Sequence, residues 1–299
     1  MGVFLDLKGL PANHDNFIGV DSDGCVYDTM NVKQKEHFHP MIIRHWKLEP
    51  VAEALRECAV FSNLTSRRRG ANRYHALLRT FELLSGHPDV VAANFSAPRV
   101  DDLRRYVNSG LPMGRATLEA EARRTGSEEL FSVLEWTDLM DADLAAMQPA
   151  PPFENAVIAL EQMRQYGDVV VVSQTPESSL FREWRHHRLD HIPAFIAGQE
   201  HGSKTEQLLS ATQGKYDRSR VLMVGDAPGD LVASREAGCL FYPIMPGAEE
   251  ESWLRLHKKI YPAFLKGGYD ETLRAALERE FLDALPETPP WRSKEVSDE

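Results

Sequence analysis

Three short apolar runs along the chain each end in a polar or acidic turn. They cover residues 16–23, 168–175 and 220–230. Runs that are apolar at consecutive positions are typical of parallel strands, because both faces of such a strand are buried. Weaker runs at 194–197 and 239–242 fit as further strands of the same sheet.

Helical patterns separate these apolar runs. Residues 153–167 carry apolar side chains three or four positions apart, which places them on one stripe of a helix. A second pattern over residues 203–214 begins with Ser203, at a position typical of a helix N-cap. The alternation of strand and helix predicts an α/β fold with a doubly wound, Rossmann-like parallel sheet.

The interval after the first strand has a different pattern. Residues 72–86 repeat apolar side chains with helical spacing and stop at Gly86, and residues 118–126 and 128–136 also favour helix. No alternating strand pattern is convincing between residues 30 and 152. An insert of about 120 residues is long enough to hold a core of its own. We therefore expect a helical second domain here.

These patterns predict a discontinuous chain organisation. The α/β core would comprise residues 1–29 and 153–285, with the α-helical domain at 30–152. The proline-rich segment at 149–152 would be a stiff connection between them. Two amphipathic stretches after Tyr242 are expected to pack as terminal helices, and the polar tail at 286–299 is expected to be disordered.

Composition and charge narrow the function classes. The chain has 299 residues, 42% of them hydrophobic, and a formal net charge of -11. This charge argues against a general nucleic-acid or membrane-surface binder, so an anionic substrate would need a metal ion or a local basic pocket. The apolar runs fall short of the roughly 20 residues that a membrane span needs.

The three cysteines stand far apart, which suggests neither a disulfide framework nor a zinc site. The N-terminal residues also lack the pattern of a secretory signal. We therefore expect a cytoplasmic protein.

Candidate chemistry lies where the first apolar run ends. Asp21 and Asp23 are two positions apart, so on a strand they would face one side, at the edge where open α/β sheets bind ligands. Adjacent carboxylates repel each other unless a cation or a proton intervenes, and Mg²⁺ is a natural partner. Asp226 and Asp230, in the turn after a later strand, would supply further oxygens.

Simpler explanations exist for these acids. Asp21 and Asp23 could be ordinary turn residues. A calcium-binding loop is excluded by the position of Gly24, which is the fourth residue of the stretch where that loop needs glycine sixth. Four motifs that occur together in a fixed order weaken the turn interpretation.

The ordered motifs resemble those of the haloacid dehalogenase superfamily of phosphatases and phosphotransferases. The DxDG motif at residues 21–24 follows the first strand, Ser173 ends a later strand, Lys204 begins a helix, and the acidic turn "GDAPGD" closes the set. Together the motifs span residues 17–242. Taken singly, Ser173 could be a simple strand end and Lys204 a solvated surface residue.

The resemblance implies a role for each motif residue. Asp21 would be the nucleophile and would form an aspartyl-phosphate, and Asp23 would be the general acid and base. Mg²⁺ would be held by the carboxylates of Asp21 and Asp226 and the backbone carbonyl of Asp23, with support from Asp230. Lys204 and Ser173 would stabilise the phosphoryl oxygens.

The resemblance also gives the helical insert a role. In this superfamily an insert placed directly after the first motif is a mobile cap that closes over the core and selects the substrate, which implies hinges near residues 29–31 and 149–152. Basic residues of the cap are candidates for binding a second anionic group of the substrate: Arg67, Arg68, Arg69, Arg73 and Lys33. An exposed basic helix end and a surface lysine are the alternatives.

The function that these features predict is that of a Mg²⁺-dependent phosphatase acting on a small phosphorylated metabolite. Asp23 is present, whereas the dehalogenases and phosphonoacetaldehyde hydrolases of this superfamily lack an acid at that position. A phosphomutase of the β-phosphoglucomutase type is the nearest alternative, and a phosphonoacetaldehyde hydrolase fits less well. A catalytically silent binding protein on the same fold is a further hypothesis.

Overall fold

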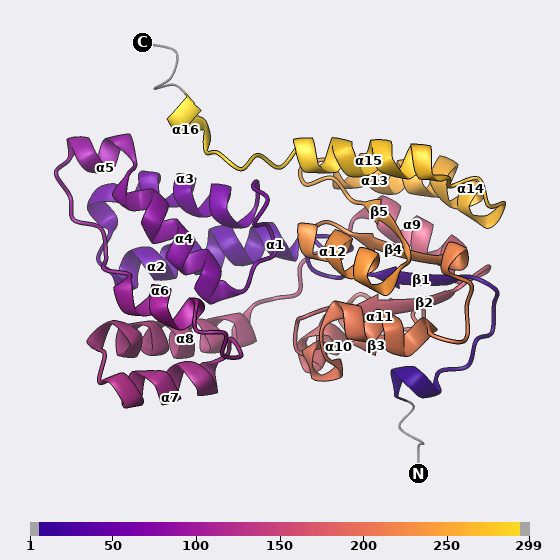
Figure 1. Cartoon of the computed structure of the whole chain (residues 1–299), viewed down its shortest axis with the longest axis horizontal. Helices are drawn as coiled ribbons and strands as arrows, with labels where there is room; N and C mark the ends of the chain where they lie inside the picture. Colours follow the sequence, from indigo (N-terminus) through magenta and orange to yellow (C-terminus); the bar gives the residue numbers. More distant parts are fainter. Residues whose placement is uncertain (1–5, 294–299) are drawn as a thin grey trace. The chain divides into compact units, whose positions relative to one another are not determined.

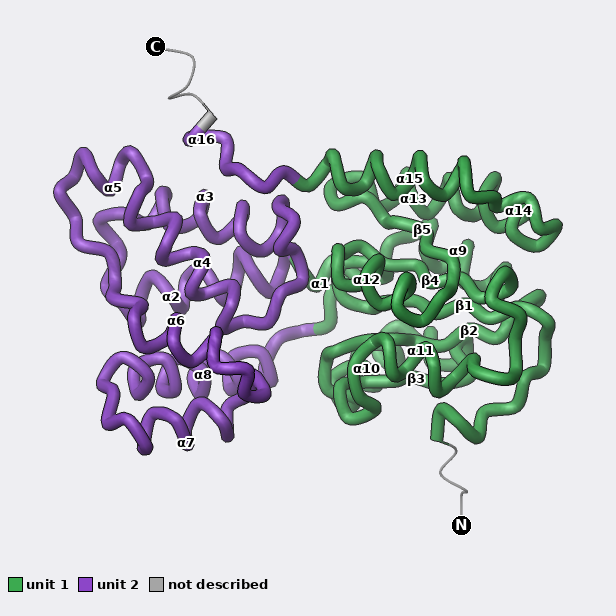
Figure 2. The backbone as a smooth tube through the Cα atoms, viewed as in Figure 1, with its two compact units in different colours: residues 1–30, 149–285 green, residues 31–148, 286–299 purple. Residues whose placement is uncertain are grey.

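A computed structural model of the chain describes residues 6–293. The chain forms two compact units (Figure 2). Residues up to 30 and residues 149–285 form the α/β unit, and residues 31–148, together with residues from 286 onwards, form the helical unit. The chain therefore passes from one unit to the other three times. Across the described residues no helix is both long enough and apolar enough to cross a membrane.

The α/β unit is built on one five-stranded parallel sheet (Figure 1). The strands are β1 (Phe17–Val20), β2 (Asp168–Val172), β3 (Phe195–Ala197), β4 (Val221–Gly225) and β5 (Leu240–Pro243). Their order across the sheet is β3-β2-β1-β4-β5, with β1 in the centre. The predicted α/β class and all five predicted strands are confirmed.

Helices follow the strands and cover the sheet. The first four are α9 (Glu154–Met163), α10 (Glu177–His186), α11 (Lys204–Thr212) and α12 (Pro228–Ala237). After β5 come α13 (Glu249–Arg255), a π-helical turn (Leu256–Ile260), α14 (Tyr261–Leu265) and α15 (Glu271–Asp283). Short 3₁₀ turns lie at Leu7–Gly9, Gln199–His201 and Arg218–Arg220.

Both faces of the sheet are packed. Ile18 and Val20 of β1 belong to a hydrophobic cluster with residues of α9, α10 and α13. Phe17, whose side chain alternates with theirs, belongs to a second cluster with residues of α11 and α12. Every residue of β1, β2 and β4 is buried, which explains why their sequences are apolar at every position except Asp168.

The helical unit has a separate core. Buried aromatic side chains such as Phe81, Tyr106 and Trp136 lie at its centre. Residues 31–148, all of which are described, contain no strand. The elements are α1 (Thr29–Val32), a π-helix (Lys33–Phe38), α2 (His39–His45), a 3₁₀ turn (Glu49–Val51), α3 (Ala52–Asn63), α4 (Arg73–Ser85), α5 (Pro88–Ala92), α6 (Asp101–Val107), α7 (Arg115–Thr125) and α8 (Glu128–Ala146).

The segment after residue 285 differs from expectation. Pro290–Ser293 forms the short helix α16, and the ring of Trp291 contacts Phe61 and His87 of the helical unit. One aromatic side chain thus anchors a segment whose composition is otherwise polar. Residues 294–299 of the predicted disordered tail lie outside the described residues.

A buried carboxylate fastens the N-terminal segment to the sheet. Asp168, at the start of β2, accepts hydrogen bonds from the backbone amides of Asn13 and His14, at 2.9 and 3.0 Å, and from the Tyr216 hydroxyl at 2.8 Å. Burial alone would raise the pKa of Asp168, but the hydrogen bonds from Tyr216 and His14 lower it below its ordinary value of 3.8.

Asp168→Asn is expected to lower the free energy of unfolding by about 2–3 kcal/mol at pH 7, because charge-assisted hydrogen bonds to a buried group are lost. A carboxylate with a lowered pKa stabilises the fold above its unfolded pKa, and that stabilisation is lost as the pH falls through the folded pKa. The difference between variant and natural chain should therefore shrink below about pH 4. Urea unfolding of the variant and the natural chain at pH 7 and below about pH 4 measures this difference in free energy, with the exposed Asp15→Asn as control. A difference that is the same at both pH values would contradict this explanation.

Candidate active site

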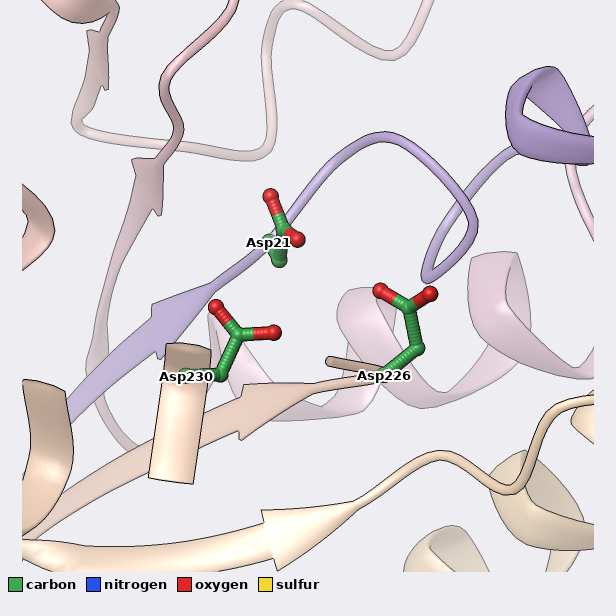
Figure 3. A group of neighbouring side chains, drawn as sticks. All are labelled: Asp21, Asp226 and Asp230. Carbon is green, nitrogen blue, oxygen red and sulfur yellow. The ribbon is translucent and has the colours of Figure 1, made fainter. Parts of the chain in front are cut away.

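Three carboxylates meet at the carboxyl edge of the sheet. Asp21 follows β1, Asp226 follows β4, and Asp230 lies in the first turn of α12. All three are buried, and one oxygen from each lies within 4.8 Å of the others. Figure 3 shows the three side chains grouped at this edge, with their carboxylates directed to the same side. The amide of Asp21 donates to the carbonyl of Val224 at 2.9 Å, so the pairing of β1 with β4 continues into the site.

Lys204 is the cation of this cluster. Ser203 caps α11, and its hydroxyl and amide exchange hydrogen bonds with Glu206, which places Lys204 at the start of the helix. The Lys204 ammonium lies 2.8 Å from Asp21 Oδ2 and 2.5 Å from Asp230 Oδ1. The structure thus places Lys204, one of the motif residues, in contact with two of the three clustered acids.

Burial and charge oppose each other in this cluster. Burial raises the pKa of Asp21 well above its ordinary value, and the carboxylates of Asp230 and Asp226 raise it further, against the ammonium of Lys204. Burial alone would lower the pKa of Lys204, but the charges of Asp21 and Asp230 raise it. The single ammonium contacts two of the three carboxylates, so the ionised cluster has an excess of negative charge.

The donor set fits a hard divalent cation. Carboxylate oxygens are the ligands that Mg²⁺ takes in proteins, and these three are close enough to share one ion. Asp230 has both oxygens engaged by the chain, since Oδ2 accepts from the Ala227 amide at 3.0 Å and Oδ1 faces Lys204. Asp230 therefore orients the cluster as well as adding charge to it.

The side chain of Asp23 has other partners. Its Oδ1 accepts from the Thr29 hydroxyl at 2.8 Å and its Oδ2 from the Thr175 hydroxyl at 2.7 Å. The two-residue alternation of a strand does not extend to it, because β1 ends at Val20 and the chain turns at Gly24, which has a φ of +77°. The carboxylate of Asp23 consequently lies outside the group formed by the other three acids.

Ser173 follows β2 and is buried. Its amide donates to the carbonyl of Ala197 at 3.0 Å, and its hydroxyl oxygen accepts from the amide of Thr175 at 3.1 Å. The hydroxyl accepts that hydrogen bond through a lone pair, so its own proton is available to an acceptor such as a phosphoryl oxygen.

Comparison with known proteins supplies structures of similar architecture. A haloacid dehalogenase-like family hydrolase from Streptococcus pneumoniae has 14% identity and a TM-score of 0.41, over 82% of this chain and 91% of that chain. A predicted phosphoglycolate phosphatase from Haemophilus somnus has 13% identity and a TM-score of 0.47, over 77% and 85%. A defluorinating L-2-haloacid dehalogenase has 14% identity and a TM-score of 0.36, over 78% and 82%. No family model and no curated protein matches the sequence.

The order of the parallel strands, the helical unit inserted after β1 and the acids at the strand ends decide the fold. The chain has an α/β fold with a helical insert after the first strand, which is the architecture that its resemblance to the haloacid dehalogenase superfamily implies. The similar structures are named for different reactions, so the activity of this chain has to be argued from its own residues.

Three of the basic residues expected to bind substrate, Arg67, Arg69 and Arg73, contact other residues of the helical unit. Arg69 is buried and donates to the carbonyl of Leu64 at 3.0 Å. Arg73 lies 2.6 Å from Asp141 and over the ring of Phe38. Arg67 lies 3.7 Å from Glu287, Arg68 is exposed, and Lys33 begins the π-helix. A substrate-binding role for Arg69 or Arg73 would require exchange of these contacts.

Sequence reasoning missed three residues that contact the site. Thr29 and Thr175 hold Asp23, and Gln207 binds the backbone beside Ser173. Thr175 could have been suspected from its place two residues after Ser173, in the turn that follows β2. Gln207 gives no such signal, because a glutamine inside a helical pattern is usually a solvated surface residue.

Proposed function

We propose that this chain is a Mg²⁺-dependent phosphatase that hydrolyses a small phosphorylated metabolite through an aspartyl-phosphate. The observation that carries the proposal is the buried Asp21 carboxylate, which contacts Lys204 and lies within 4.8 Å of Asp226 and Asp230. This arrangement would combine a nucleophile, a fixed cation and a site for a divalent metal at the carboxyl edge of the sheet.

Asp21 acts as the nucleophile. One oxygen of its carboxylate attacks phosphorus, the bond from phosphorus to the ester oxygen breaks, and the phosphoryl group remains on Asp21. Water then attacks phosphorus and releases inorganic phosphate, which restores the carboxylate. The Lys204 ammonium and the Ser173 hydroxyl donate to the phosphoryl oxygens as charge shifts onto them.

Asp21, Asp226 and Asp230 would hold the metal, together with the backbone carbonyl of Asp23. When bound, Mg²⁺ supplies positive charge that offsets the phosphoryl oxygens and lets the substrate anion approach the acids. Because the whole chain has a net charge of -11, an anionic substrate needs a local positive charge of this kind in order to bind.

Asp23 supplies the proton that the reaction needs. The departing alkoxide takes a proton from the Asp23 carboxyl group, and the resulting carboxylate later accepts a proton from the attacking water. Displacement of a halide ion needs no such proton, because halide is a stable anion. An acid at position 23, with hydroxyl groups on both of its oxygens, therefore favours phosphate esters over haloacids.

A panel of phosphate monoesters and haloacids tests the proposal. Incubation with Mg²⁺ should release inorganic phosphate from at least one ester, excess EDTA should stop the release, and no halide should appear. Conversion of a sugar phosphate to its isomer without free phosphate would identify a phosphomutase instead. Release of halide, or no reaction with any ester in a broad panel, would refute the phosphatase proposal.

Mg²⁺ should also stabilise the folded chain independently of turnover. A ligand that binds only the folded state at about 100 times its dissociation constant adds roughly 2.7 kcal/mol to the free energy of unfolding. We expect Asp226→Asn to abolish most of this gain, because it removes one of the three clustered carboxylates. Thermal unfolding with and without Mg²⁺ measures the effect, with the exposed Asp283→Asn as control. Equal stabilisation of both variants would argue against this metal site.

A further inference from the structure

Gln207 is a fully buried polar residue one turn after Lys204 on α11. Its side-chain Nε2 lies within hydrogen-bond distance of three backbone carbonyl oxygens, which share its two N–H donors: those of Ser173 at 2.9 Å, Gly198 at 2.9 Å and Gly202 at 3.0 Å. These carbonyls belong to the loop after β2, the loop after β3 and the loop before α11. A single side chain thus joins the backbone beside Ser173 to the helix that carries Lys204.

The orientation of this amide is fixed by its acceptors. A reversed amide would place Oε1 against three carbonyl oxygens, so Nε2 must face them. In the observed orientation Oε1 is buried and has no hydrogen-bond partner among the described residues. A buried acceptor without a partner is unfavourable by about 1–3 kcal/mol. Methionine or leucine at this position would avoid that penalty, so packing alone does not account for glutamine.

A second glutamine reinforces the same contacts. The side-chain amide of Gln174 donates to the carbonyl of Gly202 at 2.8 Å and to that of Ser173 at 3.3 Å. The Ser173 carbonyl therefore accepts hydrogen bonds from two side-chain amides. This fixes the plane of the peptide that links Ser173 to Gln174.

The fixed peptide presents a free donor. The peptide is trans, so the Gln174 N–H points opposite to the Ser173 carbonyl and away from Gln207. Within the described residues this N–H makes no hydrogen bond, whereas the neighbouring amides of Ser173 and Thr175 both do. An oriented N–H next to the Ser173 hydroxyl is the type of group that binds a phosphoryl oxygen.

We propose that Gln207 is a positioning residue of the phosphoryl site: it holds the Ser173–Gln174 peptide so that the Gln174 N–H donates to the phosphoryl group. This inference rests on the proposed phosphatase function. It assigns Gln207 no contact with the substrate, and it predicts that its loss weakens phosphate binding through the Gln174 amide.

Gln207→Met tests the inference, because methionine keeps the length of the side chain and removes the donors. Inorganic phosphate is titrated into the Mg²⁺-loaded chain while the backbone amide signal of Gln174 is followed by NMR, and kcat and KM are measured on the best ester. In the natural chain the Gln174 signal should shift and saturate. In the variant the dissociation constant of phosphate and KM should each rise roughly tenfold, as expected for loss of one charge-assisted hydrogen bond.

Phe281→Leu serves as a control for stability, since Phe281 is buried on α15 against Phe241. It should lower the midpoint of thermal unfolding and leave phosphate binding unchanged. If Gln207→Met also lowers only the midpoint, with phosphate affinity and KM within about twofold of the natural values, Gln207 is a packing residue and the inference is wrong. A natural chain that shows the Gln174 shift but hydrolyses no ester would refute the phosphatase and retain the positioning role.

Discussion

Asp21→Asn is expected to lower kcat/KM for phosphate-ester hydrolysis by about four orders of magnitude or more, because an amide oxygen cannot form the phosphoryl-enzyme bond. The substitution conserves volume at a buried position. It also removes one of three clustered carboxylates whose mutual repulsion opposes their burial. We therefore expect the variant to be folded and its thermal midpoint to be at least that of the natural chain in the absence of Mg²⁺.

Two measurements make this result decisive. Rapid quenching of the natural enzyme during turnover should trap a phosphorylated peptide that contains Asp21, and the variant should trap none. Asp283→Asn, the same chemical change at an exposed position, should retain normal activity. Mass spectrometry of the assayed variant excludes partial deamidation to aspartate as a source of residual turnover. Activity within tenfold of the natural chain would show that Asp21 is not the nucleophile.

The sheet could be predicted from the sequence because its strands are parallel and buried on both faces. Phe17–Val20, Asp168–Val172 and Val221–Gly225 are consequently apolar at nearly every position, a pattern with few alternative explanations. The start of α11 could also be predicted, since the signal of its capping box lies within four consecutive residues. Local patterns of this kind depend little on the rest of the fold.

One partner of Asp23, Thr175, could not be predicted because it comes from a distant part of the chain. Thr175 is 152 positions away from Asp23 in the sequence, and its approach depends on how the loop after β2 is folded. The alternation that suggested a common direction for Asp21 and Asp23 applies only within a strand, and the strand ends at Val20. Likewise, the composition of a polar tail does not indicate that Trp291 contacts Phe61 and His87.

Asp23→Asn is expected to lower kcat/KM for alkyl phosphates by roughly 10²–10⁴-fold, because asparagine cannot protonate the departing alkoxide. The size of the loss should depend on the leaving group. The p-nitrophenolate ion is stable without a proton, so formation of the aspartyl-phosphate from p-nitrophenyl phosphate should slow by less than about tenfold. Hydrolysis of the intermediate still needs Asp23 as a base, and phosphorylated Asp21 should therefore accumulate in the variant. A burst of p-nitrophenol followed by slow turnover would reveal this accumulation.

Thr175→Val, which removes one hydroxyl from Asp23 and keeps the carboxylate, is the matched control and should lose less activity than Asp23→Asn on every ester. Equal losses for alkyl and p-nitrophenyl phosphates in the first step would mean that Asp23 does not act as the acid, and that its two hydroxyl partners hold it for a structural purpose.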